Sequence, residues 1–143
     1  METMMKAMGY QEHGDGSVLK ELECQQPKLG RGKVIVEVHA IGLNPLDYRL
    51  RRGELKLITA FTMPRLIGSD FAGVVVETCK SVSGFEIGDK VFGMVSQVID
   101  GSSADRIAVR SSQIAHLPSA LDFSTGASVP LACLTAYQAL KHL

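Results

Sequence analysis

A strand that runs directly into a capped helix constrains this sequence more than any other feature. From Lys33 to Ile41, apolar and β-branched residues recur at every second position, which predicts a half-buried strand. The following residues predict a short helix, because Pro45 suits its first position, Asn44 its N-cap and Asp47 the positive end of its dipole. Such a junction holds polar side chains rigidly at the rim of a cleft, and we expect the functional site there.

Other short strands, separated by glycine turns, indicate a small β-rich fold. They are predicted over Val18–Cys24, Asp70–Thr78, Lys90–Met94 and Gln113–Leu117. Gly73, inside the second of these, suggests a bulge or a close backbone approach. The turn at Asp100-Gly101 predicts a hairpin that pairs residues 94–99 with 104–110.

The character of the sequence changes near Leu121, where β-branched residues become fewer. Asp122 can cap a short helix, and Pro130 can open a second one. We therefore expect a mainly β, partly open barrel with short helices. We place the main domain at residues 1–120 and a helical junction at residues 121–143.

Length, charge balance and cysteine content limit the classes of function that this chain can have. The 143 residues are enough for about one domain, and 15 basic residues balance 15 acidic ones. This balance predicts no nucleic-acid or anionic-membrane partner. No apolar run approaches the roughly 18 residues that a membrane-spanning helix needs. Three separated cysteines without a C-x-x-C pair indicate a reducing compartment, so we expect a cytoplasmic protein.

Four segments, in this order and spacing, resemble one family. They are Val34–Asp47, Ile67–Val75, Phe85–Phe92 and Leu131–Tyr137. Together they are similar to the N-terminal GroES-like domain of the medium-chain dehydrogenase/reductases, and most of all to its zinc-independent quinone oxidoreductase (zeta-crystallin-like) branch. The resemblance covers nearly the whole chain, and four motifs in order are far more specific than any one of them.

The resemblance implies an oxidoreductase that reduces a small quinone or enone with NADPH or NADH. It also implies a Rossmann domain that binds most of the cofactor and often forms a homodimer. No G-x-G-x-x-G turn occurs in these 143 residues. We therefore expect a truncated piece of a longer protein that is inactive alone, with a naturally short protein as the alternative.

The resemblance also implies that no metal is bound. Zinc-dependent relatives carry a cysteine where this chain has Asn44, a G-H-E motif where it has Gly68–Asp70, and a third ligand where it has Leu131. Cys133 comes two residues too late to replace that ligand. Because catalytic zinc needs three protein ligands, we predict a zinc-independent reaction.

The resemblance suggests four site residues, each with a structural alternative. Asn44 and Thr135 are candidate cofactor-binding residues, although Asn44 can act as a plain N-cap and Thr135 can bond its own helix. Tyr48 and Asp70 are candidate catalytic residues, although Tyr48 can serve in packing and Asp70 in a turn before its strand. Asp47 is expected to be structural.

A second hypothesis is a stand-alone GroES-like module that binds or assembles without catalysis. The final helix favours the enzyme, because it is the junction that precedes a Rossmann domain in the family. The gene sequence beyond Leu143 separates the two hypotheses.

Overall fold

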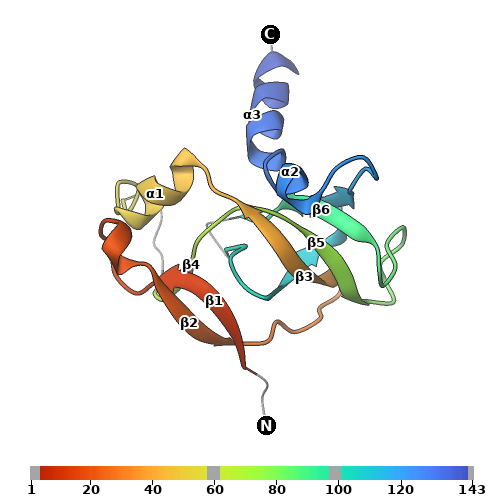
Figure 1. Ribbon diagram of the computed structural model, residues 1–143, viewed down its shortest axis with the longest axis horizontal. Coiled ribbons are helices and arrows are strands. Elements are labelled where there is room, and N and C mark those ends of the chain that lie inside the picture. Colours follow the sequence, from red (N-terminus) through yellow and green to blue (C-terminus); the bar gives the residue numbers. More distant parts are fainter. Residues whose placement is uncertain (1–3, 58–61, 97–100, 142–143) are drawn as a thin grey trace.

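The computed structural model describes residues 4–57, 62–96 and 101–141, which form two antiparallel sheets and several short helices (Figure 1). The smaller sheet has the order β2-β1-β4, with β1 at Met4–Tyr10, β2 at Lys20–Gln25 and β4 at Arg65–Leu66. The larger sheet has the order β7-β3-β5-β6-β8. Its strands are β3 (Lys33–Gly42), β5 (Asp70–Thr78), β6 (Lys90–Met94), β7 (Arg106–Arg110) and β8 (Ile114–His116). Neither sheet closes into a barrel, so the predicted β-rich and partly open fold is confirmed.

One apolar core joins the two sheets. Met5 and Ala7 of β1 pack with the inward side chains of the larger sheet. The fully buried members of that sheet include Val34, Val36, Phe71, Val75, Val91 and Val109. Buried positions alternate with more exposed ones along β1, β6 and β7, as expected for strands covered on one face. In the central strands β3 and β5, residues 34–36 and 70–73 are buried without a break, so both faces of the sheet are covered there.

Gly73 marks an irregularity between β3 and β5, as the sequence predicted. Val38 pairs with Gly73 and Ala40 pairs with Ala72, so the register shifts by one residue at this point. A Cβ atom on Gly73 would lie 2.0 Å from the carbonyl oxygen of Glu37. Only glycine permits this close approach of the two strands.

The predicted hairpin between residues 94–99 and 104–110 is wrong. Met94 pairs with Asp70 of β5, whereas β7 crosses to pair with β3. The second edge of β6 is covered by β8, through pairs such as Phe92 with Ala115, so β6 has no free edge for β7. Residues 97–100 of the predicted turn lie outside the described residues.

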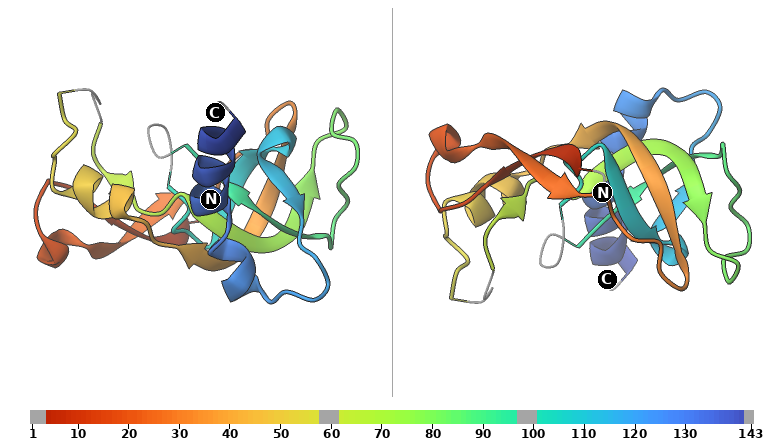
Figure 2. Two further views of the ribbon diagram at one scale, coloured as in Figure 1. Left: turned by 90° about the horizontal axis from the view of Figure 1, so that it is seen from above. Right: turned by 90° about the horizontal axis from the view of Figure 1, so that it is seen from below.

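Three α-helices and two 3-10 turns complete the described chain. They are α1 (Pro45–Arg51), α2 (Phe123–Ala127), α3 (Pro130–Lys141), η1 (Gly16–Val18) and η2 (Ser111–Gln113). Helix α2 packs on β3 and β5, while α3 projects away from both sheets (Figures 1 and 2). Within the described residues, no helix is both long and apolar enough to cross a membrane.

Candidate functional site

The junction between β3 and α1 forms as the sequence predicts, and Asp47 stabilises it. The backbone N–H of Asn44 donates to Oδ2 of Asp47 at 2.6 Å. Oδ1 of Asp47 accepts from the backbone N–H of Gly68 at 2.8 Å. The Asp47 side chain is buried, so it caps α1 and also ties that helix to the loop before β5. The predicted structural role of Asp47 is confirmed.

Asp70, the first residue of β5, lies at the centre of the site. Its Oδ2 accepts from Nδ2 of Asn44 at 3.0 Å, and its Oδ1 accepts from the backbone N–H of Leu131 at 3.0 Å. The hydroxyl of Ser102 donates to the Asp70 carbonyl at 2.9 Å. The residue is only 1% exposed, and every oxygen of its side chain has a donor.

Burial dominates the electrostatics of this carboxyl. It raises the pKa of Asp70 above its ordinary value, and the hydrogen bonds from Asn44 and Leu131 act in the opposite direction. The nearby charge of Asp47 raises the pKa further. The structure therefore places Asp70 out of solvent, and its predicted catalytic role remains a prediction.

Thr135 lies one helical turn beyond Leu131 in α3. Its Oγ1 donates to the carbonyl oxygen of Leu131 at 2.7 Å, which is the structural alternative foreseen for this residue. The side chain is nevertheless exposed, and its oxygen can still accept a hydrogen bond from a ligand. Both roles of Thr135 are compatible with this geometry.

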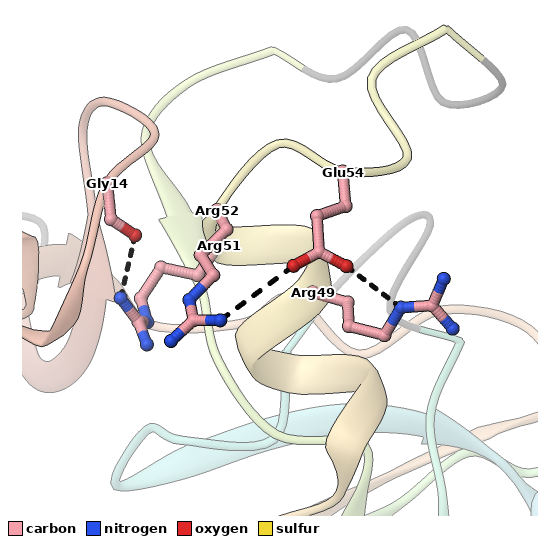
Figure 3. Close-up of polar contacts among 5 residues, drawn as sticks. All are labelled: Gly14, Arg49, Arg51, Arg52 and Glu54. Atoms are coloured by element: carbon pink, nitrogen blue, oxygen red, sulfur yellow. Dashed lines mark hydrogen bonds and ion pairs between the residues drawn. The ribbon is translucent and has the colours of Figure 1, made fainter.

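Tyr48 lies one turn after Asn44 on α1 and is 43% exposed. The guanidinium carbon of Arg52 lies 5.3 Å from the centre of the Tyr48 ring, which is a cation–π distance. Arg52 is in turn 3.9 Å from Glu54, and Glu54 accepts from Nε of Arg49 at 3.0 Å (Figure 3). The ring is therefore held by a small ion-paired cluster that leaves the side chain accessible.

The end of α1 is also fixed to the preceding turn of the chain. Nη1 of Arg51 donates to the carbonyl oxygen of Gly14 at 2.7 Å (Figure 3). The backbone N–H of Gly14 donates to the carbonyl oxygen of Arg51 at 3.0 Å. These contacts at both ends make α1 a defined support for Asn44 and Tyr48.

The structure brings three of the four predicted site residues, Asn44, Asp70 and Thr135, into one hydrogen-bonded group. Asn44 bonds Asp70 directly, Asp70 bonds the first turn of α3, and Thr135 bonds that same turn. The Tyr48 side chain contacts Arg52 and is not part of this hydrogen-bonded group. The backbone N–H of Leu131 was not predicted, because a main-chain donor leaves no mark in the sequence.

At the three positions where zinc-dependent relatives carry metal ligands, the side chains of this chain do not fit a catalytic zinc. They are the amide of Asn44, the hydroxyl of Ser69 and the alkyl group of Leu131, whereas zinc sites use nitrogen, thiolate or carboxylate donors. Among the described residues, no three His, Cys, Asp or Glu side chains are grouped to hold a metal ion.

A separate cavity of about 540 Å³ lies where α3 meets β6 and β8. Its walls include Met94, Ile114, Cys133, Leu134 and Tyr137, and neither Asn44 nor Thr135 lines it. Sequence reasoning missed this cavity, because its walls come from segments whose pairing was not foreseen.

Comparison with known proteins gives the family. Residues 30–138 match the alcohol dehydrogenase GroES-like domain. The chloroplastic NADPH-dependent alkenal/one oxidoreductase of Arabidopsis thaliana is 36% identical over 95% of this chain and 37% of its own length.

Two solved structures share the fold. The quinone oxidoreductase from Coxiella burnetii has a TM-score of 0.88 at 33% identity, covering 98% of this chain and 45% of its own. The Escherichia coli quinone oxidoreductase, complexed with NADPH, has a TM-score of 0.81 at 26% identity, covering 95% and 40%.

This chain thus spans less than half the length of each of these relatives. The match over residues 30–138 and the agreement in fold lead to one conclusion: the chain belongs to the alcohol dehydrogenase GroES-like family of the medium-chain dehydrogenase/reductases, whose members similar to it include quinone and enone oxidoreductases.

Proposed function

We propose that this chain is the catalytic-domain part of a zinc-independent oxidoreductase that reduces quinones or α,β-unsaturated carbonyls with NADPH. The observation that carries the proposal is that Asp70 accepts hydrogen bonds from Asn44 and Leu131, two residues that stand where zinc-dependent relatives carry metal ligands. The names of the relatives supply the reaction class, since they include an alkenal/one oxidoreductase and quinone oxidoreductases.

The uncharged hydrogen-bonding groups of the site fit the ribose and carboxamide of a nicotinamide cofactor. Asn44 gives one amide hydrogen to Asp70, and its oxygen and second hydrogen can meet a ribose hydroxyl or the carboxamide. The exposed oxygen of Thr135 can accept from the carboxamide. When bound, NADPH supplies the hydride, and the protein supplies orientation and electrostatics.

Tyr48 is the group proposed to meet the substrate. Its exposed phenol can donate a hydrogen bond to a carbonyl oxygen, where negative charge collects as the conjugated system is reduced. Arg52 holds the ring from one face and adds positive charge beside it. A conjugated carbonyl spreads its charge over several atoms, so donors and positioning can suffice without a metal.

Residues 121–143 are proposed to lead into a Rossmann domain that binds most of the cofactor and mediates a homodimer. The gene sequence beyond Leu143 tests this part. A glycine-rich turn between a strand and a helix soon after this position supports the enzyme. A stop codon in the native gene supports the alternative, a non-catalytic GroES-like binding module.

The reaction is tested by purifying the protein that the native gene encodes and following NADPH oxidation with a quinone and with an enone. Consumption of NADPH that depends on either acceptor is expected. Absence of turnover with every acceptor, in a folded protein that binds NADPH, would contradict the proposal.

A further inference from the structure

Three segments that are far apart in the sequence meet at one buried carboxylate. Asn44 begins α1, Asp70 begins β5, and Leu131 lies in the first turn of α3. The Asp70 side chain accepts from the other two residues at 3.0 Å each, one donor to each oxygen. A carboxylate that is 1% exposed is normally costly to bury, and two good hydrogen bonds offset much of that cost.

Helix α3 has few other contacts that fix its position. Pro130 is buried, but every residue from 132 to 141 is exposed, and the helix projects from the sheets (Figure 1). Helix α3 contacts the larger sheet chiefly at β6. The direction of the helix therefore depends on how its N-terminal turn is held, and Thr135 moves with it.

The carboxylate of Asp70 is chemically suited to holding the N-terminal turn of α3. A negative charge at the N-terminus of a helix interacts favourably with the helix dipole, and an unpaired N–H of the first turn needs an acceptor. The same carboxylate fixes the amide of Asn44, on the opposite side of the site. Asp70 thus sets the spacing between the two candidate cofactor-binding residues.

We propose that Asp70 is a positioning residue, which joins α1, β5 and α3 through its hydrogen bonds with Asn44 and Leu131. The proposal rests on the proposed function insofar as Asn44 and Thr135 contact the cofactor. The positioning itself is a property of this chain and is measured without cofactor or substrate.

Substitution by alanine and by asparagine separates positioning from acid–base catalysis. Asp70→Ala removes both acceptors. Asp70→Asn keeps an acceptor for Leu131 and, once the Asn44 amide turns over, a second hydrogen bond with Asn44. A residue that transferred protons would lose its function in both variants, whereas a positioning residue would keep it in the asparagine variant.

Hydrogen exchange followed by NMR on this chain is the test. In Asp70→Ala, amides 131–138 should exchange about tenfold faster, while amides of β3 remain within about threefold of the parent chain. In Asp70→Asn, both groups of amides should remain within about threefold. Asp122→Asn, which alters a carboxylate that caps α2 through Thr125, is the matched control and should leave α3 unchanged.

Two results would overturn the proposal: unchanged exchange of α3 in Asp70→Ala, or equal loosening of α3 in the alanine and asparagine variants. If the alanine variant does not fold, an NMR measurement on the unmodified chain tests the hydrogen bond between Leu131 and Asp70. The scalar coupling across the hydrogen bond from the Leu131 amide nitrogen to the Asp70 side-chain carbon should then be observed. Its absence, with both signals resolved, would refute the contact.

Discussion

Nδ2 of Asn44 donates a 3.0 Å hydrogen bond to Oδ2 of Asp70, and this contact ties the start of α1 to the start of β5. It gives Asn44 a defined orientation at the rim of the site, since one of its amide hydrogens is fixed. A residue with its amide fixed in this way is prepared to meet a ligand at little cost in side-chain entropy.

Asn44→Ala should lower kcat/KM for hydride transfer by about tenfold or more in the enzyme that contains this chain, because a cofactor contact and the partner of Asp70 are both lost. The remaining activity should not respond to a chelator. Gln26→Ala, an amide deletion in the loop between β2 and β3, serves as the control and should leave the kinetics unchanged. Parent-like kinetics for Asn44→Ala would remove this residue from the site.

Tyr48→Phe tests the phenol apart from the ring. Phenylalanine keeps the surface on which Arg52 lies, so the cluster with Glu54 should persist. Loss of the O–H should lower kcat by about tenfold with little change in KM, because the donor acts where charge develops. Steady-state kinetics with an enone measure this. If the phenylalanine variant works as well as the parent, Tyr48 has a packing role.

Gly42→Ala should destabilise the chain by about 3 kcal/mol, because the added methyl group overpacks the contact between β3 and α2. Its Cβ would lie 2.3 Å from the carbonyl oxygen of Ala127 and 2.9 Å from Cβ of Asp70. Gly16→Ala is the matched control, since a Cβ on Gly16 has no atom within 4 Å. Urea unfolding of both variants gives the comparison. Equal stabilities would show that α2 does not press on Gly42.

The pKa of Asp70 predicts a pH dependence of stability. Burial raises this pKa in the folded chain, so above the ordinary value of 3.8 the folded state holds a proton that the unfolded state has released. The contribution of Asp70 to the free energy of unfolding should therefore fall as the pH rises from below 3.8 through the raised pKa.

The Asp70→Asn variant lacks this titration, so the difference in unfolding free energy between parent and variant isolates the contribution of Asp70. The lowered pKa values of Asp15 and Asp122 act with the opposite sign, but they are present in both proteins and cancel in the difference. Urea unfolding between about pH 3 and pH 7 measures the difference, parent minus variant, which should decrease with pH. A difference that increases with pH would mean that hydrogen bonding outweighs burial at Asp70.

The sequence predicted the elements in which local pattern and tertiary environment agree. Strand β3 is rich in β-branched residues, α1 has its capping residues, and Gly73 marked the shift in register. Strand β1 was not predicted, because Met4 and Met8 are apolar although they point outward, which obscures the alternation. The hairpin was predicted wrongly, because a turn signal cannot reveal that β8 takes the edge of β6.

The site was predictable as residue types but not as a connected group. Asn44, Tyr48, Asp70 and Thr135 were named from the resemblance to a family, while the contact between Asp70 and the Leu131 backbone depends on how α3 is placed. Donors from the main chain and the burial of a carboxyl are products of the tertiary fold, and no local pattern encodes them.

The decisive measurement of zinc-independent reduction is NADPH oxidation by the enzyme that the native gene encodes, with an enone as acceptor, before and after removal of metal ions by a chelator. We expect acceptor-dependent loss of NADPH absorbance at the same rate before and after chelation. Residues 1–143 alone, as the comparison, should show no turnover. Loss of activity on chelation and its recovery with zinc would contradict a zinc-independent reaction.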